Sequence, residues 1–421
     1  MNTRRIALTI VVGICIIGTI LLIQRYSQPT FVGVFHPPSS NAPTSTTATT
    51  QPALLPSLLP SPNLHGQVVI AAPLPLTAED GALGQELQQA MTLASEEINH
   101  ANGVNGKTLQ IVFRDTRCQA NADLLRRQVQ DVFSSSTISA IMGGACSAEA
   151  ANLFQFGQMY HVPVVSPLVD APSLSSGNGY AYRLMPIATQ AARAEAEASV
   201  NILHAKTAAV IVEQDSNPEA LGAAFAQAFR VAGGRVTMNE TYPLQGSDFR
   251  SIVAKVQTTH PDVIFIAPRM SAPGIVAIFD LRRAGVNVPI LTTETLLNPS
   301  VIHDYADRLE GVYGVEPQVA SSSAWEAFQQ RYTVRFGTAP VWKNAAMNAY
   351  SEVFLMKDVL SAGAQSGAQV RQKIERLTPW SGGELQGLSF DAQRNRVLHA
   401  FNLFQLKEGQ EVFATGVVNV Q

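Results

Sequence analysis

The stretch that decides the fold is residues 138–165, ISAIMGGACSAEAANLFQFGQMYHVPVV. It opens with an apolar run at 138–142, turns at Gly143-Gly144, shows helical periodicity over 147–160 and closes with a second apolar run at 162–165. A strand, a helix and a strand joined by connections this short predict parallel pairing in a sheet covered by helices on both faces.

The same alternation continues on both sides of this unit. Upstream, strands are expected at 67–72 and 109–113 and a helix at 120–133; Leu83 and Leu87 begin the apolar face of another helix, which ends at Asn102-Gly103. After 182–185 the pattern restarts, with strands expected at 208–212, 236–242, 263–267, 289–292 and 311–315 and helices at 188–203, 220–232, 249–258 and 274–284. The chain then gives helical stretches at 325–336, 345–362 and 369–377 and β-rich segments at 388–390, 397–405 and 412–420. The fold class is therefore α/β: two doubly wound, Rossmann-like lobes, with a ligand site where the carboxyl ends of their strands face one cleft.

The N-terminus reads as a targeting element. Arg4 and Arg5 precede the uncharged apolar run 6–23, which at 1.5 Å per residue spans roughly 27 Å, close to the hydrocarbon thickness of a membrane. We expect a signal anchor over 1–27, a single transmembrane helix with everything after it outside the cytoplasm. A cleaved signal peptide is the alternative. Residues 28–65 are rich in Pro, Ser, Thr and Ala and read as an extended linker.

Composition excludes several kinds of chemistry. The net charge of -3 is small, and it offers no basic surface for nucleic acid. The eight histidines lack metal-ligand spacing, and no G-x-G-x-x-G follows the first strand, so we expect no metal and no cofactor. The run Gly143–Ser147 is not a G-x-S-x-G elbow, and the chain is not expected to be an enzyme.

Three cysteines are present, and Cys15 falls in the apolar N-terminal run. Cys118 and Cys146 remain for the exported body, where an oxidising compartment favours a disulfide between them. Two separate free thiols are the alternative.

Several local patterns, taken together, carry a family resemblance. They are Ile98-Asn99 with Gly103, Val104 and Gly106; Asp115 with Cys118; the run 143–147; the run 162–167; Pro261–Ile264; Arg283-Ala284-Gly285; and Gly387–Asp391. In this order and spacing the body from Gly66 onward resembles the type I periplasmic binding proteins of ABC importers, in particular the group that binds branched-chain amino acids. In that family the two matching cysteines form a disulfide, and three hinge crossings join the lobes, here near Pro186, 315–317 and 389–391. The implied domains are lobe I, at 66–186 and 317–388, and lobe II, at 187–316 and 389–421.

The resemblance also implies a binding site for a zwitterion. Ser147 opens a helix whose free N–H groups suit a carboxylate, and it matches the serine that the family uses for the ligand α-carboxylate. Glu294 follows a lobe II strand and matches the acidic residue that pairs with the α-ammonium. A plain N-cap serine and a solvated loop glutamate are the alternative interpretations.

Other positions depart from the family pattern. Asp170 and Leu168, from one segment, are both candidate ligand-binding residues. Asp170 stands where a hydroxyl residue is usual in the family; it would suit a ligand with extra positive charge or cap a turn. Asn217 and Arg269 stand where better-known members carry aromatic residues, and Arg269 either clamps a carboxylate, pairs with Asp170 or Glu294, or points into water. Leu83 matches the side-chain pocket. These departures argue against plain leucine or valine as the ligand, and a polar or differently charged amino acid fits the pattern as well.

The predicted function is capture of a small amino-acid-like solute outside the cytoplasm and its delivery to an ABC permease, with the N-terminal helix anchoring the chain to the membrane. A membrane-tethered sensor that uses the same cleft is the alternative, and an enzyme on the same architecture is a third possibility because fold does not fix function.

Overall fold

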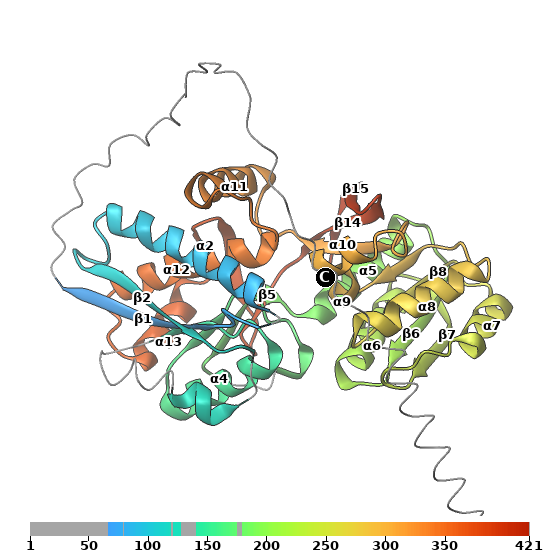
Figure 1. The fold of residues 1–421 in the computed structure, drawn as a ribbon, viewed down its shortest axis with the longest axis horizontal. Helices are drawn as coiled ribbons and strands as arrows, with labels where there is room; N and C mark the ends of the chain where they lie inside the picture. Colours follow the sequence, from blue (N-terminus) through green and yellow to red (C-terminus); the bar gives the residue numbers. More distant parts are fainter. Residues whose placement is uncertain (1–65, 79, 119–120, 128–139, 175–178, 421) are drawn as a thin grey trace, which may run out of the picture. The chain divides into compact units, whose positions relative to one another are not determined.

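The computed structural model describes residues 66–420, apart from 79, 119–120, 128–139 and 175–178, with the backbone alone at 415–417 (Figure 1). The predicted anchor at 1–27 and linker at 28–65 lie outside the described residues. Among the helices of the described part, none is both long enough and apolar enough to span a bilayer.

Lobe I is built on a sheet with the strand order β11-β12-β13-β5-β4-β3-β1-β2. Neighbours from β13 through β5, β4, β3 and β1 to β2 pair in parallel, whereas β11 and β12 run antiparallel to their neighbours. The parallel pairing of β3 with β4, on either side of α4, confirms the α/β prediction made from residues 138–165. The bounds are β1 Gln67–Leu74, β2 Thr108–Asp115, β3 Ile141–Met142, β4 Val164–Ser166, β5 Ala181–Pro186, β11 Trp380–Gly382, β12 Leu385–Phe390 and β13 Asn395–Val397.

Helices cover both faces of this sheet. Four helices share one apolar core on one face, and α4 packs in a second core on the other face. The alternation of side chains along β1 sets this up: Ile70 and Ala72 belong to the first core and Ala71 to the second. The helices of the first face are α2 Gly81–His100, α11 Ser322–Phe336, α12 Lys343–Ser361 and α13 Gly367–Leu377; α4 is Ser147–Tyr160, and a short 3-10 turn, η1, spans Pro172–Leu174.

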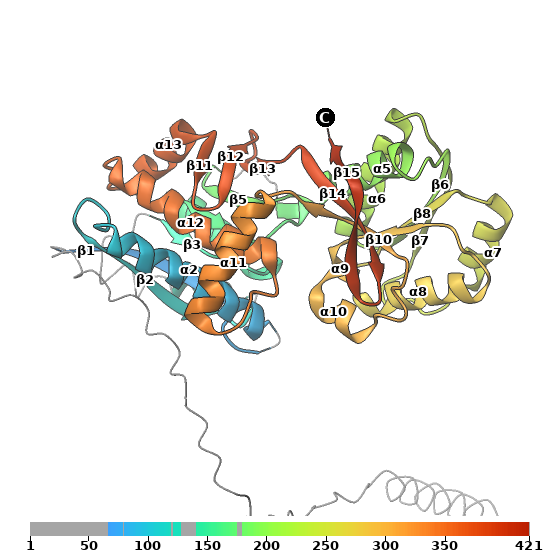
Figure 2. The same cartoon turned by 90° about the horizontal axis from the view of Figure 1, so that it is seen from above.

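Lobe II repeats the arrangement with the strand order β15-β14-β10-β9-β8-β6-β7, parallel from β10 to β7 and antiparallel at β14 and β15 (Figure 2). Its strands are β6 Thr207–Glu213, β7 Arg235–Tyr242, β8 Val263–Ala267, β9 Ile290–Thr292, β10 Tyr313–Pro317, β14 Ala400–Lys407 and β15 Gln410–Asn419. Helices α5 Ala188–Asn201 and α6 Ser216–Val231 cover one face. Helices α7 Arg250–Thr259, α8 Ser271–Arg283, α9 Glu294–Leu297 and α10 Pro299–Asp304 lie on the other.

The chain crosses between the sheets three times. It leaves the lobe I sheet after β5 at Pro186 and returns after β10 at Pro317. The third crossing differs from the prediction, which placed it at 389–391 and began the last part of lobe II at residue 389. Strands β12 and β13 pair with each other and with β5, so the crossing lies at 398–399 instead. The predicted β-rich segment 397–405 is accordingly divided, because its two ends belong to different sheets.

Two buried arginines hold the crossings on the lobe I side. Arg396 is 1% exposed and donates to the carbonyl oxygens of Leu184 on β5 (3.1 Å) and Val319 after β10 (3.1 Å), and to Asn348 Oδ1 (3.2 Å). Since Arg396 itself lies on β13, one guanidinium contacts the segments next to all three crossings. Arg183 on β5 donates from its Nε to Asn395 Oδ1 (2.9 Å). Burial lowers the pKa of both arginines to about 10.

Candidate ligand-binding site

A cavity of about 530 Å³ is lined by residues of both lobes and of the crossings, which is a size typical of small-molecule sites. Most of its wall comes from loops at the carboxyl ends of parallel strands, where open α/β sheets bind ligands. Lobe I contributes the start of α2, the segments 145–147 and 168–170, and 341–345; lobe II contributes 292–294, 297–299 and one face of α5; the crossings contribute Met185, Pro186 and 315–317.

Ser147 lines the lobe I side of the cavity as the first residue of α4. The turn before it takes the chain from β3 into the helix, and Gly144 adopts a φ of 83°, a left-handed conformation that favours glycine. Ser166 at the end of β4 fixes this turn, because its hydroxyl donates to the Gly144 carbonyl (2.8 Å). The Ser147 side chain is exposed at the free N-terminal end of a 14-residue helix, a position suited to an anion.

Glu149 stabilises the same turn through its side chain. It is fully buried, and its carboxyl group accepts hydrogen bonds from Thr116 Oγ1 (2.5 Å) and from the backbone N–H of Gly144 (3.2 Å). Burial, only partly offset by these bonds, raises the pKa of Glu149 to about 7. The carboxyl group is therefore a structural member of the Ser147 turn.

Cys118 and Cys146, the two cysteines predicted to pair, are joined by a disulfide with a Cα–Cα distance of 5.7 Å. It fastens the residues after β2 to the residue that precedes Ser147. Within the described residues, one group has ligand atoms close enough together to hold a metal ion: Asp80 with these two cysteines. Both cysteine sulfurs are committed to the disulfide, so they are not available as thiolate ligands.

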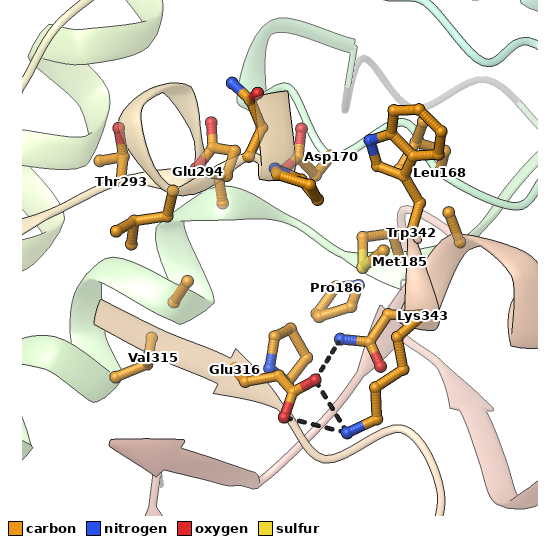
Figure 3. A pocket seen from close by; sticks show the side chains of 18 of the residues that line it. Leu168, Asp170, Met185, Pro186, Thr293, Glu294, Val315, Glu316, Trp342 and Lys343 are labelled. Atoms are coloured by element: carbon orange, nitrogen blue, oxygen red, sulfur yellow. Dashed lines mark hydrogen bonds and ion pairs between the residues drawn. The ribbon is translucent and has the colours of Figure 1, made fainter. Parts of the chain in front are cut away.

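Glu294 and Asp170 bring two carboxylates to the cavity from different lobes (Figure 3). Glu294 opens α9 directly after β9, and its side chain is exposed to the cavity. Desolvation by the surrounding protein raises the pKa of Glu294. Desolvation raises the pKa of Asp170 well above its usual range, and the charge of Glu294 raises it further, whereas the nearby Arg183 lowers it. The two carboxylates therefore repel each other across the cavity.

Glu195 on α5 is a third carboxylate on this wall. It is only 2% exposed, and desolvation raises its pKa well above the usual range, with a further contribution from the charge of Glu294. The sequence interpretation did not identify it. The sequence does place this glutamate on the apolar face of an alanine-rich helix. The same pattern also fits an ordinary amphipathic helix, so it does not indicate a binding residue.

On the opposite side, β10 and the start of α12 meet through an ion pair. Lys343 Nζ lies 3.1 Å from Glu316 Oε1, and both residues line the cavity. Figure 3 marks the contacts between these two side chains with dashed lines. Glu86 of α2 positions this end of α12, because its buried carboxylate accepts the backbone N–H groups of Val341 and Trp342 at 2.7 Å each. The ring of Trp342 also lines the cavity. These residues were not predicted, since they meet only in the folded chain.

Seven residues were predicted to bind the ligand, and the structure brings five of them to this one cavity: Leu83, Ser147, Leu168, Asp170 and Glu294. Arg269 and Asn217 do not line it. Arg269 lies near Asp215, with 3.6 Å between Arg269 Nε and Asp215 Oδ2, and does not pair with Asp170 or Glu294. Asn217 is near the start of α6, where its backbone N–H donates to Asp215 Oδ1 (3.1 Å). Both residues are held by the Asp215 loop.

Two α/β lobes, three crossings and a cavity at the carboxyl ends of the strands define the two-lobed class of ligand-binding proteins. The family model described as periplasmic binding protein matches residues 67–411, and the chain belongs to that family. The resemblance inferred from the sequence is confirmed, and membership implies a location outside the cytoplasm.

Individual relatives are distant. An amino acid binding protein of Pseudomonas aeruginosa is 25% identical over 261 residues, which cover 60% of this chain and 68% of that protein. The branched-chain amino acid transporter substrate-binding protein of Streptococcus pneumoniae, solved with isoleucine, is 19% identical with a TM-score of 0.68 over 84% of this chain and 99% of its own. A solute-binding protein of R. palustris, solved with benzoate, is 18% identical with a TM-score of 0.64 over 84% of this chain and 97% of its own. At these identities the structural likeness shows the fold.

Proposed function

We propose that this chain captures an amino-acid-like solute in the cavity and delivers it to an ABC permease. The proposal depends on one observation: Ser147 of lobe I and Glu294 of lobe II line the same cavity. A helix N-terminus suits a carboxylate, and a carboxylate suits an ammonium group, so the two positions are complementary to a zwitterion. The P. aeruginosa relative is described as an amino acid binding protein, which supports this ligand class.

We propose that the chain binds its ligand without catalysing a reaction. The ligand can contact both lobes at once only when the lobes have closed around it. Ligand binding therefore favours the closed arrangement over the open one. No catalytic step is assigned to the cavity residues. The N-terminal residues 1–27 are proposed to anchor the chain, so that the binding lobes stay near the permease at the outer face of the membrane.

Calorimetric titration of the full chain with a panel of amino acids tests the ligand class. At least one amino acid should bind without turnover, and Glu294→Gln should weaken its binding by about 2–5 kcal/mol because an ammonium then faces a neutral amide. Glu219→Gln, at an exposed position of the same lobe that does not line the cavity, is the matched control and should leave affinity unchanged. Equal affinities for the wild type and Glu294→Gln would remove Glu294 from the contacts.

Uptake measurements separate delivery from sensing. Cells that lack the chain should lose uptake of the bound amino acid, and expression of the intact chain should restore it. A variant without residues 1–27, exported by a cleavable leader, should leave the membrane fraction. Unchanged uptake in cells without the chain, together with altered gene expression, would favour the tethered-sensor alternative.

A further inference from the structure

Glu195 is a buried carboxyl group for which the described residues supply no ion-pair partner. It belongs to α5, it is 2% exposed, and the accessible part of its surroundings is the cavity that it lines. Among the described residues, its backbone carbonyl oxygen accepts a hydrogen bond from Ser199 Oγ (2.7 Å), and neither a hydrogen bond nor an ion pair involves its carboxyl group. An isolated buried carboxylate is costly, so natural proteins pair such groups with a cation or another donor.

Small side chains on one face of α5 explain why this carboxylate reaches the cavity. Ala188, Ala191 and Ala192 line the cavity on the same helix face, one to two turns before Glu195. Helix side chains lean toward the N-terminus of the helix, and therefore Glu195 leans over these alanines. Because alanine leaves room above the helix surface, a ligand group can approach the carboxylate directly.

Acidic side chains outnumber basic ones on the cavity wall. The cavity wall carries six carboxylates and one ammonium group among its described residues: Asp80, Asp170, Glu195, Glu294, Glu316 and Glu411 against Lys343. Lys343 is already paired with Glu316. Glu294 is the shared neighbour, since its charge acts on both Asp170 and Glu195. The wall therefore places two further carboxyl groups, Asp170 and Glu195, near enough to Glu294 to sense its charge.

We propose that the cavity is selective for an α-amino acid whose side chain carries a second cationic group. Glu294, together with Asp170, receives the α-ammonium, and Glu195 receives the side-chain cation. This inference rests on the proposed function and names the substrate class of the same cavity. When these carboxylates bind the two cationic groups of the ligand, the Ser147 turn remains to bind its α-carboxylate.

Binding of such a ligand releases protons. Desolvation and the charge of Glu294 raise the pKa of Glu195 in the empty cavity, and a bound cation lowers it again. Titrations in buffers with different ionisation enthalpies should therefore show more proton release for a dicationic amino acid than for a neutral one of equal length.

Matched pairs of ligands isolate the second cation. Lysine and norleucine, ornithine and norvaline, and 2,4-diaminobutyric and 2-aminobutyric acid differ within each pair only by the terminal amine. Calorimetry on the full chain should show at least tenfold tighter binding for the dicationic member of one or more pairs. This comparison uses the wild-type chain, so it does not depend on whether a variant folds.

The variant Glu195→Gln tests whether Glu195 contacts the side-chain cation of the ligand. It should weaken binding of the preferred dicationic ligand at least tenfold and change binding of its neutral partner by less than about twofold. Glu352→Gln is the matched control, because Glu352 is also fully buried and without a hydrogen-bond partner among the described residues, yet it does not line the cavity. Thermal melts of both variants establish that they are folded.

The outcomes separate this inference from the proposed function. Neutral amino acids that bind as tightly as their dicationic partners, or an equal loss for both in Glu195→Gln, would overturn the inference and leave amino-acid capture standing. Failure of every amino acid in the panel to bind would overturn the proposed function itself.

Discussion

Glu149 shows how a single buried side chain ties stability to pH. Its pKa is raised from 4.5 to about 7 because burial disfavours the charged form. The folded chain thus keeps the Glu149 proton to higher pH than the unfolded chain does. The stabilisation that the proton confers is complete below pH 4.5 and is lost as the pH rises through about 7.

We therefore expect Glu149→Gln to flatten the pH dependence of stability. A shift of this size corresponds to about 3 kcal/mol, so the wild type should lose up to that amount between pH 4.5 and 7 relative to the variant. Urea unfolding at several pH values measures it. Glu326→Gln, at an exposed position on α11, should retain the wild-type profile. Parallel profiles for Glu149→Gln and the wild type would show that Glu149 does not titrate in this range.

At the scale of elements, the disulfide joins the loop after β2 to the start of α4. Its cysteines are 28 positions apart, and closing a loop of that length stabilises a fold by about 2–4 kcal/mol. The double variant Cys118→Ser, Cys146→Ser should lose about this much unfolding free energy. Adding a reductant should destabilise the wild type and leave the variant unchanged. Equal stability of the two proteins under oxidising conditions would contradict the prediction.

The sequence predicted the elements well wherever apolar periodicity and turn residues agreed. Helix α4 was expected at 147–160 and lies at Ser147–Tyr160, and β8 was expected at 263–267 and lies at Val263–Ala267. The stretch 397–405 was predicted as one β-rich segment. Only pairing with distant strands divides it into β13 and β14.

The cavity was predictable where local sequence fixes geometry. Ser147 and Glu294 follow strands, and the carboxyl ends of parallel strands share one sheet edge, so their place could be inferred. Glu195 lies on α5 and Trp342 directly precedes α12, and their orientation depends on how these two helices pack against the sheets. Arg269 also follows a strand, but a neighbouring aspartate holds it elsewhere. Such competition between charged partners cannot be inferred from spacing.

At the scale of the whole molecule, Arg396 should be decisive for stability. Replacing it with methionine removes the donors to Leu184 and Val319, whose carbonyl oxygens then stay buried without these bonds. We expect Arg396→Met to reduce the free energy of unfolding by about 3 kcal/mol or more, because several hydrogen bonds are lost together.

Chemical denaturation of the full chain measures this loss. Arg250→Met is the matched control, since the Arg250 side chain is 88% exposed in its ion pair and should contribute little to stability. Similar losses for the two variants would mean that Arg396 does not brace the crossings. Arg396→Lys should fall between the wild type and Arg396→Met, because one ammonium cannot reach all the acceptors of a guanidinium.

The late position of the third crossing has a consequence for the order in which the chain can fold. As the polypeptide emerges from its N-terminus, the first sheet lacks β11, β12 and β13 until residue 397 has appeared, and the second lacks β14 and β15 until residue 419. The core that α2, α11, α12 and α13 share and both cores of lobe II contain residues from 380 onward, so these three cores are completed late. A chain truncated before residue 395 would therefore lose sheet strands from both lobes at once.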